Sequence, residues 1–390
     1  MFFLLTSILT STPIIIAPKD PDAVKKLKAC EKAVRQISFS KAIESEEPTR
    51  VVVDVSSISV EASYDGPRLP EAVPGDPLRV PRDFVMEMIE CFKAQKLIHK
   101  KYVLQILMAA KDLFAKQKSL LRVNVPEDGE EEGHFTVCGD THGQFYDLCN
   151  IFTLGGFPSA SNPYLFNGDF VDRGSFSFEV VFTLIAFKLS DPECLHMMRG
   201  NHETKNMNKI YGFEGEILHK YDVTVYNLFA EVFCWLPLAA VIQDKVFVVH
   251  GGLSTKDDGA FPLSEIDEIH RGKEPPDSGL MSDLLWSDPQ HAPGRARSKR
   301  GVGFSFGPDI TQNFLDRNGL SLVVRSHEVK DEGYVVEHDG KCITIFSAPN
   351  YWYAFYDHNI LFVIPNLLMY NECNLCNLLD MRIFCTTETI

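Results

Sequence analysis

The sequence lacks an excess of positive charge, because 38 Lys and Arg residues stand against 53 Asp and Glu residues and leave a formal net charge of −15. Proteins whose main task is to bind a nucleic-acid backbone need a basic surface that releases counterions, so nucleic acid is not expected as the partner. The 390 residues are 45% apolar and 23% charged, as in ordinary globular proteins. This length allows one large domain with extensions at its ends.

The sequence also has little that would direct it to a membrane or stabilise it by disulfides. The apolar segment Met1–Ala17 contains Pro13 and several hydroxyl residues, is shorter than the roughly 20 residues of a membrane span, and lacks a basic leader region. Ten cysteines are scattered without dense spacing, which is typical of reduced thiols. We therefore expect no leader, anchor or membrane partner, and a cytoplasmic or nuclear location.

Short apolar runs of strand length dominate the chain after His134, and helical patterns at Phe145–Leu154 and Phe176–Leu189 lie between them. Strands are predicted at Phe135–Cys138, Tyr164–Phe166, Leu195–Met198, Val246–Val249, Leu322–Arg325 and Ile343–Phe346. Two further helices are predicted before this region, one from about Pro81 and one over Val103–Phe114. This alternation predicts an α/β core with ligand-binding turns at the carboxyl ends of its strands.

Five of the predicted strands end in turns that carry carboxylate, imidazole or amide groups. These turns are Gly139–Gly143 (GDTHG), Gly168–Gly174 (GDFVDRG), Gly200–Glu203 (GNHE), His250–Gly252 (HGG) and Arg325–Glu328 (RSHE). Each one alone is most often an ordinary turn. Because all five follow strands of one predicted core, we interpret them together as one site.

The ligand types in these turns indicate a metal centre. Asp, His and Asn side chains without cysteine favour Mn, Fe, Zn or Mg over a thiolate site. Six candidate ligands exceed the number that one catalytic ion with an open position needs. They suit two ions about 3.5–4 Å apart that share one carboxylate, an arrangement that binds and hydrolyses phosphate esters.

Other residues near these turns fit a phosphate ester. Arg173 follows the second turn, and Arg300 ends a basic run from Arg295; guanidinium groups bind phosphate oxygens in a bidentate manner. An ordinary solvated basic loop is the alternative for that run. His202 is a candidate general acid for the leaving alkoxide, and Asp172 is a candidate for orienting its imidazole and raising its pKa.

The motifs, taken in order, resemble those of the phosphoprotein phosphatase family of metal-dependent serine/threonine phosphatases over Asp76–Tyr351. Details such as YGFEGE at Tyr211–Glu216 are most similar to the protein phosphatase 5 type, in which tetratricopeptide repeats precede the catalytic domain. The resemblance implies an α/β calcineurin-like metallophosphoesterase fold, with a central β-sandwich flanked by helices. It also implies hydrolysis of phosphoserine and phosphothreonine by direct attack of a hydroxide bound to two metal ions.

The same resemblance implies a role for each matching residue. One ion would be held by Asp140, His142 and Asp169, and the other by Asp169, Asn201, His250 and His327. The general acid would be His202 with Asp172, and the phosphate contacts would be Arg173, Arg300, Asn201 and Tyr351. The cofactors implied are two divalent or trivalent metal ions, with Mn²⁺ expected and Fe or Zn as alternatives.

The expected organisation is an apolar segment at 1–18, a remnant repeat helix at 19–46, a linker at 47–80, a catalytic domain at 81–351 and a divergent tail at 352–390. Phosphoproteins are the expected substrates. A heat-shock chaperone is not expected as a partner, because residues before Lys19 hold no complete repeat of about 34 residues. Two alternatives stay open: a hydrolase of another phosphate ester, and a catalytically impaired protein that binds phosphoproteins or other partners.

Overall fold

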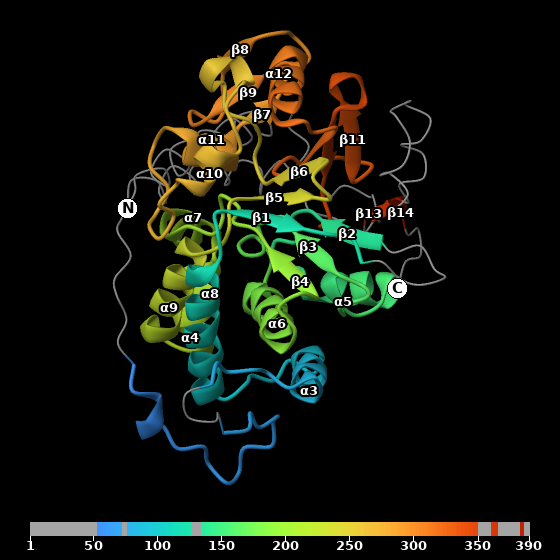
Figure 1. Ribbon diagram of the computed structural model, residues 1–390. Coiled ribbons are helices and arrows are strands. Elements are labelled where there is room, and N and C mark those ends of the chain that lie inside the picture. The colour runs from blue at the N-terminus through green and yellow to red at the C-terminus, as the bar shows by residue number, and fades with distance from the viewer. Residues whose placement is uncertain (1–52, 72–75, 127–133, 350–359, 366–382, 386–390) are drawn as a thin grey trace, which may run out of the picture.

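The computed structural model describes residues 53–71, 76–126, 134–349, 360–365 and 383–385 (Figure 1). The predicted apolar segment at 1–18, the remnant repeat helix at 19–46 and Tyr351 lie outside the described residues, as does most of the tail at 352–390. Among the described helices, none has the length and apolar character that crossing a membrane requires.

Two mixed β-sheets form the centre of the fold (Figure 1). The first sheet has the order β1 (Leu120–Val123), β5 (Ala239–Ile242), β6 (Val246–Val249), β10 (Leu322–Arg325), β12 (Cys342–Ile345), β11 (Tyr334–Glu337). The second has the order β14 (Ile383–Cys385), β13 (Ile360–Pro365), β2 (His134–Cys138), β3 (Tyr164–Phe166), β4 (Leu195–Met197). Strands β2, β3 and β4 are parallel, and so are β6, β10 and β12, so each sheet presents several carboxyl ends at one edge.

The two sheets pack face to face, as the alternation of side chains along β3 shows. Leu165 belongs to the apolar cluster that joins the two sheets, together with Phe135 of β2 and Val323 of β10. Its neighbours Tyr164 and Phe166 point the other way, into the cluster formed with the helices. Since side chains alternate between the two faces of a strand, the sheet is buried on both faces at β3. The predicted β-sandwich flanked by helices is confirmed.

Helices cover both outer faces of the sandwich (Figure 1). One side carries α3 (Arg82–Lys93), α4 (Lys100–Lys116), α5 (Phe145–Gly155), α6 (Ser177–Ser190), α7 (Lys205–Tyr211), α8 (Phe213–Lys220) and α9 (Val223–Cys234). The other side carries α10 (Ser264–Asp267), α11 (Leu280–Trp286) and α12 (Pro308–Asn318). Three 3₁₀ turns complete the described helices, η1 (Val55–Ser57), η2 (Lys256–Gly259) and η3 (His338–Gly340). Helix α6 is buried along nearly its whole length and is predominantly apolar, and its buried Glu179 is paired with Lys220.

The six predicted strands are all present, with ends shifted by one residue in β2, β4 and β12. The four helices predicted over this part of the chain are also present as α3, α4, α5 and α6. A small third sheet was not predicted from the sequence; it consists of β7 (Asp288–Pro289), β9 (Phe304–Phe306) and β8 (Arg295–Arg297). These strands are only two or three residues long, which is too short for an apolar period to identify a strand.

Helix α3 packs into the apolar cluster beneath the second sheet, and a substitution at Phe92 tests how much this packing contributes to stability. Its fully buried ring makes edge contacts with Phe145, Phe178 and Phe182. We expect Phe92→Ala to lower the free energy of unfolding by about 3–5 kcal/mol, because it leaves a cavity in this aromatic cluster. Denaturant unfolding monitored by circular dichroism measures the change. Leu154→Ala, at a side chain that is 41% exposed, is the control and should cost less than about 1 kcal/mol.

Candidate active site

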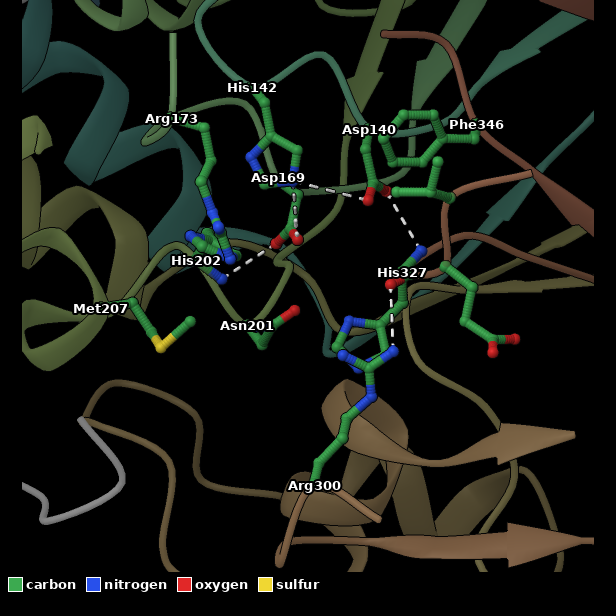
Figure 2. Close-up of a pocket in the computed structure, with 12 residues that line it drawn as sticks. Asp140, His142, Asp169, Arg173, Asn201, His202, Met207, Arg300, His327 and Phe346 are labelled. Carbon is green, nitrogen blue, oxygen red and sulfur yellow. Dashed lines mark hydrogen bonds and ion pairs between the residues drawn. The ribbon is translucent and has the colours of Figure 1, made fainter. Parts of the chain in front are cut away.

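The carboxyl ends of β2, β3, β4, β6 and β10 meet at one edge of the sandwich, and the five polar turns meet there too. They surround a cavity of about 290 Å³ (Figure 2). Five of the six predicted metal ligands line it, namely Asp140, His142, Asp169, Asn201 and His327. The sixth, His250, lies directly behind them, with Nε2 at 2.9 Å from Oδ1 of Asn201 and 3.3 Å from Oδ1 of Asp169.

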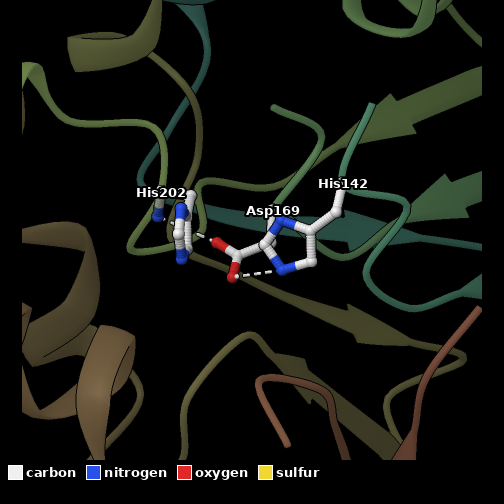
Figure 3. Close-up of side chains that lie close together, drawn as sticks. All are labelled: His142, Asp169 and His202. Atoms are coloured by element: carbon white, nitrogen blue, oxygen red, sulfur yellow. Dashed lines mark hydrogen bonds and ion pairs between the residues drawn. The ribbon is translucent and has the colours of Figure 1, made fainter. Parts of the chain in front are cut away.

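Asp169 lies at the centre of this group. Its carboxylate lies between the His142 and His202 rings (Figure 3), with Oδ2 at 3.6 Å from Nε2 of His142. Two sets of potential ligand atoms, each within 4.8 Å of one another, share this residue: one with His142 and His202, the other with His250 and His327. Asp140 joins the same group, because its Oδ2 is 3.7 Å from Nε2 of His142. Asp169 therefore has the position that a bridging ligand needs.

The turns that carry these side chains have strained backbones. His142, Asp169, Asp172, Arg173 and His327 all have positive φ angles, between 39° and 72°. This left-handed region disfavours residues with a Cβ, so each such residue costs about 1–3 kcal/mol that the surrounding structure must supply. Strained residues that belong to the turns around one cavity are typical of a functional site.

Glu203 supplies part of that support, and it was not among the predicted site residues. Its buried carboxylate accepts backbone N–H bonds of 2.8 Å from Asp169, Phe170 and Gly200. It thereby fastens the turn after β3 to the turn after β4. A Cβ on Gly200 would lie 2.2 Å from Oδ1 of Asp169, so only glycine fits this close approach. The GNHE turn already contained this glutamate, but its contact with a distant turn is a tertiary feature.

Hydrogen bonds on the far side of the imidazoles orient them toward the cavity. Nδ1–H of His142 donates to Val171 O at 2.9 Å, and Nδ1–H of His250 donates to Asn167 O at 2.7 Å. Both Nε2 atoms are thus left unprotonated and directed at Asp169. Within the described part of the chain, Nε2 of His327 is buried and has no hydrogen-bond partner. Neutral imidazoles held in this way, and a buried nitrogen without a partner, are typical of metal ligands.

The electrostatics of the cavity fit positive ions. Burial raises the pKa of Asp140 to about 7 and that of Asp169 to about 8, because buried carboxylates lose hydration. Burial also lowers the pKa of His142 and His327 well below the ordinary value, which keeps them neutral. Two cations would stabilise the ionised carboxylates and coordinate the neutral imidazoles. The donor set of oxygen and imidazole nitrogen, without sulfur, fits hard or borderline metal ions.

The predicted pairing of His202 and Asp172 is present, with Nδ1 at 2.8 Å from Oδ2. Asp172 also accepts bonds from the backbone N–H of Phe213 and from the side chain of Asn208, which fix its carboxylate. The predicted rise in the pKa of His202 is wrong. Burial, followed by the positive charge of Arg173, lowers the pKa of this imidazole well below its ordinary value. A bound anionic phosphate would oppose that shift.

Two arginines reach into the cavity from different elements, as Figure 2 shows. The guanidinium of Arg173 stacks on the ring of Tyr211 at 4.1 Å, and its backbone N–H donates to Tyr211 O. Arg300 is held by Asp288, with Nε at 2.7 Å from Oδ2, and by His327 O at 3.3 Å. Both guanidinium groups are therefore oriented before any anion binds.

Four further residues line the cavity, although they were not predicted as site residues from the sequence: Met207, Glu328, Val329 and Phe346. Glu328 was part of the RSHE turn, but nothing in the sequence marked the apolar residues as site residues. Trp286 packs its ring edge-on against His327 at 5.6 Å and is 4% exposed. Tyr351, the remaining predicted phosphate contact, lies outside the described residues.

Comparison with known proteins identifies relatives of this chain. Residues 133–331 match the family model of the calcineurin-like phosphoesterases. Serine/threonine-protein phosphatase 5 of Homo sapiens is 51% identical over 343 residues, which cover 87% of this chain and 66% of that protein. The chain thus spans just under two thirds of the length of this relative. The protein of the same name from Arabidopsis thaliana is 49% identical over 394 residues, which cover 86% of this chain and 71% of that protein.

A solved structure is also similar to this chain. It is a protein serine/threonine phosphatase from Saccharomyces cerevisiae with similarity to human phosphatase PP5. The two share 42% identity and a TM-score of 0.69, and the match covers 73% of this chain and 89% of the yeast chain.

A second family model, the PPP5 TPR repeat region, matches residues 27–122. The expectation that no chaperone binds is therefore not confirmed. Part of this match is α3 and α4, which pack on α6 and α9 within one apolar cluster. The described part of the matched region thus belongs structurally to the phosphoesterase core.

Cation binding is expected to stabilise the fold through Asp169. Mn²⁺ at one hundred times its Kd should raise the free energy of unfolding by about 2.7 kcal/mol, because a ligand that binds only the folded state shifts the equilibrium toward it. Asp169→Asn should remove most of this gain, since the amide cannot bridge two cations. Thermal melting with Mn²⁺ and with EDTA measures both. The exposed control Asp112→Asn should keep the full Mn²⁺ shift, and an unchanged shift in Asp169→Asn would contradict the central role of this carboxylate.

Proposed function

The chain belongs to the calcineurin-like phosphoesterase family, in the group of the serine/threonine-protein phosphatases 5, and on this premise we propose that it hydrolyses phosphoserine and phosphothreonine in proteins. One observation carries the proposal. The carboxylate of Asp169 is shared by two sets of potential metal ligands, and the His202–Asp172 pair lies beside it. A phosphate ester bound there would face cations on one side and a proton donor on the other.

We propose that two metal ions are held by the six ligands. Asp140, His142 and Asp169 would hold one, and Asp169, Asn201, His250 and His327 the other. Mn²⁺ is the expected ion, with Fe or Zn as alternatives that suit the same oxygen and imidazole ligands. When bound, such a pair neutralises phosphate charge and lowers the pKa of water enough to give a nucleophile at neutral pH.

His202 would supply the proton that the leaving alkoxide needs. A serine or threonine alkoxide is a poor leaving group, so a positioned acid accelerates its departure. Asp172 receives the Nδ1–H of the ring, which directs Nε2 away from Asp172. The carboxylate of Asp172 also stabilises the imidazolium form, and the phosphate dianion adds to this effect.

The arginines would hold the substrate phosphate. Arg173 and Arg300 provide guanidinium groups whose positions are fixed by Tyr211 and Asp288. Asn201 and Tyr351 are the other proposed contacts. Planar guanidinium groups match the spacing of two phosphate oxygens, so they orient the ester as well as bind it.

A reducing location is consistent with the proposed function. The six cysteines whose side chains the structure describes are free thiols. This supports the proposal of a cytoplasmic or nuclear protein, where thiols stay reduced. The site also supports the two alternatives, a hydrolase of other phosphate esters and a binding protein without turnover, and the experiment below separates them.

Phosphate release from a phosphoserine peptide in Mn²⁺ tests the proposal. We expect turnover by the wild type, and a loss of about 10²–10⁴-fold in kcat for His202→Asn, because the general acid is removed. The loss should be much smaller with p-nitrophenyl phosphate, whose leaving group needs little protonation. His219→Asn, at an exposed histidine of α8, is the matched control and should behave as the wild type.

Each alternative predicts a different outcome of the same assay. A hydrolase of other esters would cleave nucleotides or sugar phosphates in preference to the peptide. A binding protein would bind the phosphopeptide, measured by fluorescence anisotropy, without releasing phosphate. An equal effect of His202→Asn on both substrates would contradict the role of His202 as the acid.

A further inference from the structure

Next to the cavity, the strand β8 presents positive charge that the catalytic site does not use. Arg295 and Arg297 on β8 and the nearby Lys299 are exposed. We propose that this basic strand, Arg295–Lys299, binds acidic residues that flank the phosphorylated residue of a substrate. The inference rests on the proposed function, because it names the class of phosphoprotein that the same site would prefer.

The charges of the basic strand have no acidic partners among the residues that the structure describes. Some other exposed cations are paired with an acidic side chain, as Lys96 is with Asp65 at 2.8 Å. Asp309, an acidic side chain close to the start of β8, accepts the backbone N–H of Gly294 at 2.7 Å. In a chain with a net charge of −15, unpaired cations beside an anion-binding cavity are electrostatically complementary to an acidic peptide.

The strand is also placed for an extended peptide to lie along it. β8 is at the outer edge of the three-stranded sheet β7–β9–β8, and it pairs only with β9 among the described strands. Figure 1 shows it at the upper rim of the molecule. An edge strand offers free backbone groups, and a peptide can add to such an edge. Since side chains alternate, Arg295 and Arg297 point to the same face.

Arg300 connects the basic strand to the catalytic cavity. It follows Arg297 by three residues, lines the cavity, and is bonded to Asp288 of β7. Three residues of extended chain span about 10 Å, so Arg297 lies within about that distance of Arg300 along the chain. A peptide extends by the same length per residue. An acidic side chain two to four positions from the phosphoresidue would therefore reach Arg297.

A series of phosphoserine peptides tests the inference. The peptides carry one Asp at each position from five before to five after the phosphoserine, with an Asn peptide as reference. We expect kcat/KM to be highest for an Asp two to four positions away on one side, by about two- to five-fold over the Asn peptide at low salt. The preference should fade in 0.5 M NaCl, because salt screens exposed charges.

Arg295→Gln/Arg297→Gln tests the residues themselves and should reduce the ratio of Asp-peptide to Asn-peptide kcat/KM to about one. Lys118→Gln/Arg317→Gln, which removes two exposed charges that neither line the cavity nor belong to the basic strand, is the control and should keep the preference. A flat profile in the wild type, or a preference that survives Arg295→Gln/Arg297→Gln, would overturn the inference. These results differ from failure of the proposed function, in which none of the peptides would be dephosphorylated.

Discussion

The structure depends on keeping several carboxyl groups and imidazoles buried around Asp169. Burial disfavours the ionised carboxylates, and neighbouring like charges add to the cost. A site of this kind is stable only where rigid elements prevent the groups from moving apart and where positive charge compensates them. The parallel strand ends provide the first condition, and bound cations would provide the second.

The two packed sheets are rigid, and hydrogen bonds between the turns hold the site residues in place relative to the sheets. Glu203 links the turns after β3 and β4, and Asn167 donates to Val249 O and to Ser326 Oγ, which links both sheets. These bonds are buried, so breaking one would leave polar groups without partners. They hold the left-handed backbone of Asp169 and His327 against its own strain.

Ion pairs also fix Arg300, one of the two arginines that line the cavity. Asp288 accepts bonds from both Arg300 and Arg325, and the latter is fully buried. Because Asp288 belongs to β7, the small third sheet is attached to the wall of the cavity through ion pairs. The position of Arg300, the proposed phosphate contact, therefore depends on a carboxylate of the same small sheet that contains the basic strand.

Sequence alone determined three features of this protein: which residues follow each strand, the ligand types that exclude a thiolate site, and the α/β pattern. All three depend on residue type and on the local period of apolar residues. Tertiary structure decided what depends on residues far apart in the chain. It brought Glu203, Asn208 and Tyr211 into supporting contacts, placed Met207 and Phe346 in the wall of the cavity, and formed the sheet that contains β8. It also reversed the expected pKa shift of His202, since burial and the charge of Arg173 are set by packing, which no local pattern encodes.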